Sequence, residues 1–434
     1  MDDITIGFVG TGVLITLVLL GVRVVYATAA VGMLGVVAMI GWDAGATNIG
    51  MIPHAKGSLY ALSVLPMFIL IGFLAFHAGM TQSLFDAARK WLGWVPGGLA
   101  VATVFATAGF AAVSGASTAT AAVFSRVAIP EMLKYGYDPR LAAGVVAAGG
   151  TLASLIPPSA ILVIYAIIVE ESVGRLLIAG FVPGVVSALV YAAIIILRAK
   201  WNPELGRPIT GFTWGDRMRS VPGTLPIVFV IVVIFSSMYS GWATPTEAGA
   251  VGSFVVFIIA LINGMRWKTL REALLETAKL TVMIFSLIWG VLIFVRFLGF
   301  AGLPEMFANY VVGLPYPPIV IMICILLFYV VLGMFMDAIG MLLLTLPVVY
   351  PAVIGLGYDP IWFGIIVVKM CEVCLITPPI GLNCYVVAGV RPDIPLSAVF
   401  RGIAPFFICD ILTLGLFLAF PEIITWLPDQ MMNR

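Results

Sequence analysis

Charged residues are scarce in this chain of 434 residues: they make up 10% of it, while hydrophobic residues make up 62%. An average soluble domain has roughly 25% charged and about 45–50% apolar residues, so the composition excludes a soluble globular fold. The net charge of +1 provides no basic surface for a nucleic acid. Many uncharged stretches reach the roughly 20 residues that cross a bilayer. The sequence therefore predicts an all-α, polytopic protein of the lipid bilayer.

Histidine and cysteine are rare as well. The two histidines, His54 and His77, are isolated, and the five cysteines all lie in apolar stretches. Cys371 and Cys374 have the C-x-x-C spacing of a redox or metal pair, but without a second pair nearby we interpret them as small packing residues. We therefore expect no cofactor, no metal other than an alkali cation, and no enzymatic activity.

A motif recurs in the chain at a fixed distance. Residues 136–159 begin with Gly-Tyr-Asp-Pro and end after Pro157-Pro158, and residues 357–380 begin with the same four residues and contain Pro378-Pro379. The two copies are offset by 221 residues, both at the first glycine (357 − 136) and at the first proline (378 − 157). We therefore divide the chain into two related halves, 1–197 and 221–434, joined by a polar linker, 198–220.

Each proline pair interrupts an apolar stretch that is long enough to cross a bilayer. Proline lacks a backbone N–H and clashes with the carbonyl four residues earlier, so two prolines together end a helix. Open backbone at membrane depth persists only where protein or an aqueous cavity surrounds it. Interrupted helices at matching places in two halves are the best sequence indication of a transporter's binding site. We predict such broken helices at 140–169 and 361–390.

Basic residues indicate the orientation, because Lys and Arg accumulate on the cytoplasmic side of a membrane protein. The linker contains five of them, so we place it in the cytoplasm. If each of the stretches 97–130 and 317–351 enters the membrane and leaves it on the same side, most of the other basic residues also fall on the cytoplasmic side. We therefore predict two re-entrant hairpins and an inverted-topology repeat. The other apolar stretches are predicted scaffold spans, near 4–21, 24–41, 58–80, 175–197, 222–240, 244–264, 280–298 and 401–427, with amphipathic segments at 83–94 and 265–279.

The first hairpin has a polar midpoint, Val-Ser-Gly-Ala-Ser-Thr at 113–118. Hydroxyl groups and free carbonyls are hard oxygen donors for an alkali cation, and helix ends that meet there add their dipoles. The competing interpretation is that these small residues serve helix packing, but the repeat of a tip and a break in both halves favours a site. The predicted first cation site consists of Ser114, Gly115, Ser117, Ala153, Ile156 and Ser159.

The second hairpin has its midpoint at 333–338, opposite the break at 374–381. Two roles are open for Asp337, a cation ligand or a group that orients the backbone of the tip. Lys369 and Glu372, three residues apart on one helix, are predicted to form a structural pair rather than a proton relay. Further charges in apolar segments are Arg126, Arg296 and Asp410, and the sequence does not choose which arginine meets an anionic substrate.

Taken together, these motifs resemble one protein family. Ser-Gly-Ala-Ser-Thr, Gly-Tyr-Asp-Pro and Leu-Ile-Pro-Pro-Ser in the first half are followed by Ala-Thr-Pro-Thr-Glu-Ala-Gly, Gly-Met-Phe-Met-Asp-Ala, Gly-Tyr-Asp-Pro and Thr-Pro-Pro-Ile-Gly-Leu-Asn in the second. In this order, across essentially the whole chain, they resemble the large membrane subunit (DctM-like) of tripartite ATP-independent periplasmic (TRAP) transporters. Cys374 departs from the pattern, since a glycine is usual there.

The resemblance implies a sodium-driven importer of the bacterial inner membrane with an elevator mechanism. Its implied partners are a small four-helix membrane subunit, a periplasmic substrate-binding protein and a small carboxylate substrate. It implies the same first cation site and a second one formed by Gly333, Cys374, Thr377 and Ile380, to which we add Asp337. The expected substrate contacts are Ser117, Thr118, Pro158, Pro379 and Asn383.

Three other functions deserve comparison. A stand-alone ion-coupled anion transporter of related architecture would work without a binding protein. An intramembrane hydrolase with Ser114 or Ser117 as nucleophile needs a nearby base, and neither histidine lies in a segment matched to the hairpin tips. A channel is disfavoured, because asymmetric broken helices suit an occluding site better than a continuous pore.

Overall fold

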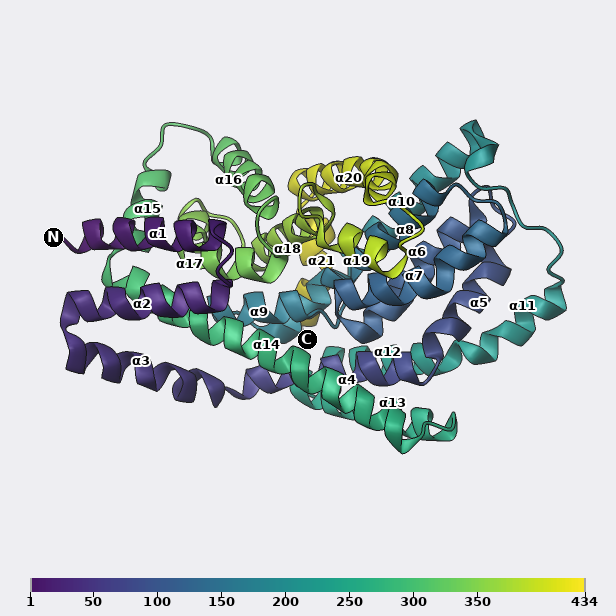
Figure 1. Ribbon diagram of the computed structural model, residues 1–434, viewed down its shortest axis with the longest axis horizontal. Helices are drawn as coiled ribbons and strands as arrows, with labels where there is room; N and C mark the ends of the chain where they lie inside the picture. The colour runs from purple at the N-terminus through teal and green to yellow at the C-terminus, as the bar shows by residue number, and fades with distance from the viewer. Residues whose placement is uncertain (1, 433–434) are drawn as a thin grey trace.

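The computed structural model describes residues 2–432, which form α-helices joined by turns and short 3₁₀ helices (Figure 1). This confirms the predicted all-α membrane class. Six helices in the described part are long and apolar enough to cross a membrane. The first is Tyr60–His77, a 3₁₀ turn that continues into α4 (Val64–His77). The others are α10 (Val173–Trp201), α13 (Pro245–Ile262), α14 (Trp267–Phe300), α17 (Ala338–Gly355) and α20 (Leu396–Ala419).

Three amino-terminal helices lie side by side at one end of the molecule, on the left in Figure 1: α1 (Asp3–Leu19), α2 (Val24–Ile40) and α3 (Trp42–Gly57). With the carboxyl-terminal part of α14 they enclose a small core of their own, which includes Val31 and Phe297. Helix α3 was not predicted, because Asp43, Asn48 and His54 interrupt its apolar character. A further short helix that the sequence did not indicate, α15 (Leu303–Val312), follows α14.

Two predicted boundaries were wrong. The amphipathic segment 265–279 and the span 280–298 form one continuous helix, α14, of 34 residues. No proline or glycine lies at the junction, so nothing ends the helix there. The stretch 401–427, in contrast, consists of α20 and a separate α21 (Glu422–Met432), because Pro421 disfavours a helical conformation at the residue before it.

Both predicted broken helices are present at the centre of the fold. The first consists of α8 (Pro139–Thr151), a 3₁₀ turn (Leu152–Ser154) and α9 (Ala160–Val169), and the second of α18 (Pro360–Ile376) and α19 (Leu382–Val390). Asp138 and Asp359 cap the amino termini of α8 and α18 by accepting backbone N–H groups, and a proline follows each of them. Every residue of α18 after the proline is buried. Such burial explains why both stretches are so strongly apolar.

Both predicted hairpins are also present. The first pairs α6 (Gly98–Ser114) with α7 (Ser117–Lys134), and the second pairs α16 (Pro318–Gly333) with α17. Helix α7 packs against α8 of its own half and against α19 of the other half, and α17 packs against α18 and against α9 in the same way. Each hairpin therefore contacts both broken helices, so that the two halves interlock.

The polar linker is ordered rather than an open loop. Helix α10 extends into the linker as far as Trp201. The end of the linker forms α11 (Trp214–Ser220), which meets α12 (Leu225–Tyr239) at 51°. Between α10 and α11 the chain bonds to the start of the first hairpin, where the N–H of Gly97 donates to the carbonyl of Gly206 at 3.0 Å. Tyr137 of the first Gly-Tyr-Asp-Pro donates its hydroxyl to the carbonyl of Arg207 at 3.0 Å. The surface helix α5 (Met80–Leu92) lies beside α11, and both are at the right of Figure 1.

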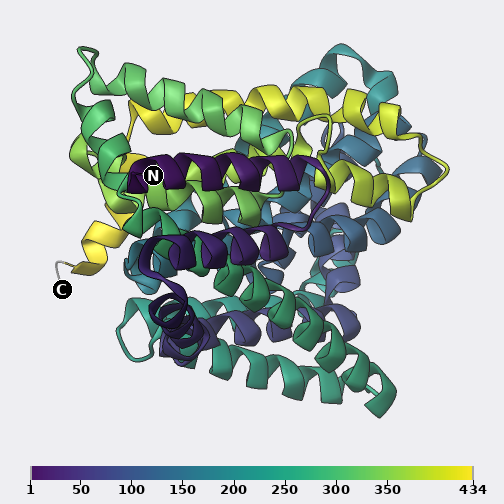
Figure 2. The same ribbon diagram turned by 60° about the vertical axis from the view of Figure 1, so that its left-hand side comes forward.

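Figure 2 brings the opposite end of the molecule forward, with the amino-terminal helices α1 and α2 one above the other.

Helices α8 and α20 cross at two glycines, Gly144 and Gly402. A Cβ atom at Gly402 would overlap the carbonyl oxygen of Arg140, whereas a Cβ at Gly415 of the same helix has open space around it. Gly→Ala in a helix normally stabilises by about 0.5–1 kcal/mol, but overpacking costs about 1–3 kcal/mol. We therefore expect Gly402→Ala to lower the melting temperature of the purified protein and Gly415→Ala to leave it unchanged or raise it. Equal melting temperatures would contradict the close crossing.

Candidate functional site

The first break leaves backbone carbonyls without their helical donors. In an α-helix the carbonyl of residue i accepts from the N–H of residue i+4. Pro157 has no N–H to give to Ala153, and the N–H of Ala160, the ordinary donor to Ile156, instead donates to the carbonyl of Gly115 on the hairpin tip at 3.4 Å. The carbonyls of Ala153 and Ile156 are therefore available as ligands, at the place where the tip meets the break.

Small residues allow this close contact between tip and break. Gly115 has a φ of 59°, a left-handed conformation that favours glycine. A Cβ atom on it would overlap the carbonyl oxygen of Pro158, an expected substrate contact that lies buried directly against the tip. The hydroxyls of Ser117 and Ser154 are 2.8 Å apart, which joins the first residue of α7 to the turn before the break. Ser154 was not predicted, although it lies inside the repeated motif beside Ala153.

Two other predicted residues of the first site differ in their orientation. Ser159 caps α9: its hydroxyl accepts from the N–H of Leu162 at 3.3 Å and donates to the carbonyl of Ser154. Ser114 bonds within its own hairpin, to the hydroxyl of Thr120 at 3.0 Å, and its backbone approaches Gly72 of α4. The structure therefore places Gly115, Ser117, Ala153, Ile156 and Ser159 at one junction, with Ser114 on the side of the tip that faces α4.

The second break frees one carbonyl in the same way. Pro378 has no N–H for the carbonyl of Cys374, which accepts the N–H of Thr377 at 3.4 Å instead. The N–H of Cys384 donates to Gly381 at 2.7 Å instead of to Ile380, so the carbonyl of Ile380 lacks its helical donor. The hydroxyl of Thr377 donates to the carbonyl of Val373 at 2.5 Å. Its oxygen lone pairs are not used by that bond, so they remain available to a cation.

The second tip packs on its break through Gly333 and Cys374. A Cβ atom on Gly333 would overlap the sulfur of Cys374, which lies 3.5 Å from the sulfur of Met341. Asp337 is exposed, and its carboxylate accepts the N–H of Gly340 at 3.0 Å and so caps α17. This bond fits the predicted orienting role, and the role as a cation ligand stays a prediction.

The two breaks differ in their exposure. Pro157 and Pro158 are buried, whereas Pro378 and Pro379 are exposed. Asn383, an expected substrate contact on α19, is fully buried; its amide N–H₂ donates to the carbonyl of Ala147 on α8 at 3.1 Å, and its oxygen has no partner in the described part of the chain. Asn383 therefore joins the two broken helices and keeps one free acceptor between them.

Helix ends of opposite sign converge at each junction. The amino termini of α7 and α9 meet at the first break with the carboxyl-terminal ends of α6 and the 3₁₀ turn. At the second break, the carboxyl-terminal end of α16 and the amino terminus of α17 pack on α18, and α19 begins where α18 ends. Amino termini favour a negative group, and free carbonyls at carboxyl termini favour a cation. Such a junction can hold a cation and an anion together.

A cavity of about 180 Å³ lies beside the first tip, between α4, α6, α7 and α14. Its lining includes Ser114, Arg126 and Glu276, and Glu276 also bonds to the imidazole of His77 at 3.0 Å. Thr118, an expected substrate contact, is half-buried in the first turn of α7. A larger cavity of about 750 Å³ near Arg296 lies between α3, α9 and α14 and contains no predicted site residue; there Arg296 bonds to Asn48 at 2.9 Å.

The predicted pair of Lys369 and Glu372 is confirmed, with 2.6 Å between nitrogen and oxygen. The sequence did not indicate its third member, Asp410 of α20, whose carboxylate lies 2.7 Å from the same nitrogen. Only the packing of α20 against α18 brings Asp410 there.

The contact between Gly333 and Cys374 can be tested by paired substitutions. Gly333→Ala should lower the melting temperature, because its methyl group overlaps the Cys374 sulfur, and Cys374→Gly in the same chain should restore it by making room. Gly389→Ala, at a position with open space, is the control. If Cys374→Gly fails to rescue Gly333→Ala, the two residues are not in the contact described.

Comparison with known proteins gives a consistent result. Residues 11–423 match the family described as tripartite ATP-independent periplasmic transporter, DctM component. A C4-dicarboxylate TRAP transporter large permease protein of Pseudomonas aeruginosa is 36% identical, over 85% of this chain and 84% of its own length. A sialic acid TRAP transporter large permease protein of Vibrio cholerae is 29% identical, over 85% and 86%. Both relatives are named as permeases, not as enzymes.

A solved structure shows the same fold. The YdaH transporter of Alcanivorax borkumensis matches with a TM-score of 0.57 at 15% identity, over 88% of this chain and 90% of that one. The family match confirms the resemblance found in the motifs: this chain belongs to the DctM component family of the tripartite ATP-independent periplasmic transporters.

Proposed function

We propose that this chain is the large membrane subunit of a sodium-driven importer of organic acid anions in a bacterial inner membrane. The observation that carries the proposal is the matched pair of junctions, in each of which a hairpin tip packs on a proline-broken helix. The small four-helix membrane subunit and a periplasmic substrate-binding protein are its proposed partners. The relatives named for C4-dicarboxylate and sialic acid support an acid substrate.

The oxygen chemistry of the junctions supports sodium as the coupling ion. The ligands at the first site are Ser114, Gly115, Ser117, Ala153, Ile156 and Ser159, and those at the second are Gly333, Asp337, Cys374, Thr377 and Ile380. Geometry favours the carbonyls of Ala153 and Ile156 and the hydroxyl of Thr377, whose lone pairs are free. A cation bound there stabilises backbone that is otherwise unpaired, so it favours the conformation with both tips docked.

Arg126 is the arginine best placed for an anionic substrate. It is on the hairpin arm α7 and lines the 180 Å³ cavity together with Ser114 and Glu276, so that a carboxylate bound there would meet the guanidinium on the α4 side of the first tip. Arg296, by comparison, lies in a different cavity. Ser117, Thr118, Pro158, Pro379 and Asn383 are the remaining proposed contacts.

Transport would proceed by an elevator movement. The hairpins and broken helices, together with α10 and α20, which pack closely on them, form one interlocked unit. This unit would move against the other helices with ions and substrate enclosed. Interlocking supports this division, because a rigid unit can carry both sites together. An intramembrane hydrolase is not supported: the hydroxyls of Ser114 and Ser117 bond to other hydroxyls rather than to a base.

Sodium dependence can be tested at Thr377. Thr377→Val keeps the shape but removes an oxygen ligand, which costs about 1–3 kcal/mol. We therefore expect the sodium concentration for half-maximal uptake to rise about tenfold, since about 1.4 kcal/mol corresponds to a factor of ten. Uptake is measured in proteoliposomes that contain the complete system.

Thr28→Val is the matched control, because Thr28 is equally buried and its hydroxyl bonds to the carbonyl of Val24 within α2, away from both junctions. It should leave sodium dependence unchanged. If Thr377→Val also leaves it unchanged, Thr377 is not a ligand.

The substrate role of Arg126 predicts a different kinetic change. Arg126→Gln removes a charge-assisted hydrogen bond, worth about 1.5–3 kcal/mol, so the substrate KM should rise about tenfold or more. Lys134→Gln, an exposed position at the end of the same helix, is the control and should keep the wild-type KM. A KM unaffected by Arg126→Gln would sink this assignment.

The alternative is a stand-alone ion-coupled anion transporter. Proteoliposomes with the two membrane subunits but without the binding protein distinguish the two functions. The proposed function predicts no uptake under that condition, and substantial uptake would favour the alternative.

A further inference from the structure

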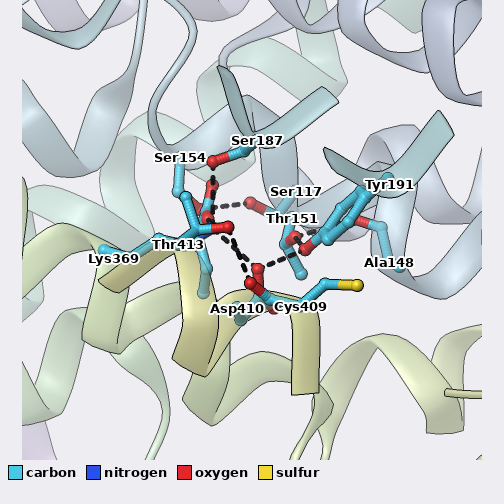
Figure 3. Close-up of polar contacts among 11 residues, drawn as sticks. Ser117, Ala148, Thr151, Ser154, Ser187, Tyr191, Lys369, Cys409, Asp410 and Thr413 are labelled. Carbon is cyan, nitrogen blue, oxygen red and sulfur yellow. Dashed lines mark hydrogen bonds and ion pairs between the residues drawn. The ribbon is translucent and has the colours of Figure 1, made fainter. Parts of the chain in front are cut away.

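Arg296 carries the only charge between Lys279 and Glu305, in the apolar carboxyl-terminal part of α14. A charge in an apolar segment of a membrane protein is costly unless it is paired or reaches water. The chain itself provides the partner for the buried Lys369, whose ammonium group lies 2.7 Å from the carboxylate of Asp410, as Figure 3 shows. For Arg296 we therefore looked for an equivalent negative group.

The described part of the chain gives Arg296 two partners, and both are uncharged. Its Nε donates to Oδ1 of Asn48 on α3 at 2.9 Å, and its guanidinium carbon lies 5.4 Å from the centre of the Phe300 ring. No carboxylate of the described residues forms an ion pair with it. A guanidinium group has five N–H donors, so four of them remain for a partner from outside the chain.

These donors line the cavity of about 750 Å³ between α3, α9 and α14. Sites that hold small molecules have volumes of about 300–1,000 Å³, so the cavity is large enough for an organic ligand. Much of its wall is apolar, with Met51, Leu292 and Val295 among the lining residues. Met51 and Phe300 are also exposed, so the cavity opens at the surface of the protein.

The position of the cavity indicates the edge of the apolar layer. Helix α14 ends at Phe300, about one turn after Arg296, and α9 ends at Val169, directly before another lining residue, Glu170. Basic side chains near the ends of membrane helices reach toward the lipid head groups. A ligand that enters from the bilayer at this level presents a phosphate at the edge and acyl chains toward the interior.

We propose that this cavity binds a zwitterionic phospholipid, with its phosphate on Arg296 and the first part of its acyl chains on the apolar wall. Arginine suits phosphate because its planar donors can bind two oxygens at once. Glu170 adds a negative charge to the same cavity, which favours an ammonium head group over a second anionic one. A carboxylate has about four acceptor positions, so Glu170 can accept from the ammonium in addition to its other contacts. A phosphoethanolamine head group meets both requirements.

A soluble organic acid fits the cavity less well. Its carboxylate would suit Arg296, but it would leave the apolar wall uncovered and would be repelled by Glu170. The proposal therefore depends neither on sodium coupling nor on the identity of the transported acid. Because the cavity lies between α9 of the interlocked unit and α3 and α14 outside it, the lipid would contact both parts of the protein.

Native mass spectrometry of the purified, delipidated full-length protein tests the proposal. Phosphatidylethanolamine should bind saturably at one site, and phosphatidylglycerol should bind there more weakly. Diacylglycerol, which lacks the phosphate, should not occupy the site. Free phosphoethanolamine, which lacks the chains, should bind at least about tenfold more weakly than the intact lipid, because it buries no acyl CH₂ groups.

Two variants test the two parts of the site separately. Arg296→Gln should weaken the binding of phosphatidylethanolamine about tenfold or more, the loss expected when a charge-assisted hydrogen bond is removed. Arg271→Gln, at an exposed position near the other end of α14, controls for general attraction of lipid and should bind as the wild type does. Gly299→Phe should block the cavity without disturbing the fold, because Gly299 lines it and a Cβ atom there has open space. Gly12→Phe, at an equally open position on α1, is its control.

Several results would overturn the proposal. One is equal binding of phosphatidylethanolamine by the wild type, Arg296→Gln and Gly299→Phe. Tighter binding of phosphatidylglycerol would contradict the zwitterionic head group, and equal binding of free phosphoethanolamine would indicate a site for a soluble ligand. Displacement of the lipid by succinate would indicate a substrate site, and its loss when the small membrane subunit binds would show that protein covers the cavity.

Discussion

Four prolines without N–H groups determine what the centre of this protein can do. Pro157, Pro158, Pro378 and Pro379 lie inside two helices that would otherwise satisfy all their own backbone groups. In water the freed carbonyls would be hydrated, but those of the first break lie inside packed protein. The first hairpin tip satisfies a backbone N–H of the break, because the carbonyl of Gly115 accepts from Ala160, but it brings no donor to the carbonyl of Ile156. The carbonyls that remain open are the oxygens that a cation requires.

The packing of the hairpins on the broken helices couples the two junctions to each other. Each hairpin packs on broken helices of both halves, and Asn383 joins α19 to α8. An ion bound at one junction therefore stabilises surfaces that also belong to the other. The difference in exposure between the two proline pairs shows that the junctions are similar in backbone chemistry but differ in their access to the surroundings.

Features governed by local chemistry could be predicted from the sequence, and features governed by packing could not. The breaks follow from proline rules that act within a few residues, and the hairpins were predicted from the side on which the basic residues fall. The fusion of 265–279 with 280–298 into α14 was missed, because a change from polar to apolar character does not by itself end a helix. Ser154, and the pairing of Asp410 with Lys369, were missed for another reason: Ser117 and Lys369 lie 37 and 41 residues from their partners in the sequence. Ser114 is of the type expected at the tip, and the structure shows its hydroxyl bonded within its own hairpin, to Thr120; its role as a ligand stays a prediction.

The central claim is that open backbone at the two junctions binds sodium specifically, and thermal unfolding of the purified wild-type protein tests it most directly. Melting temperatures are compared in sodium, potassium and choline chloride at one ionic strength, without substrate. A ligand that binds only the folded state stabilises it by about 2.7 kcal/mol at a hundred times its dissociation constant, so the account predicts a saturable rise in melting temperature with sodium alone. Equal melting temperatures in the three salts would contradict it.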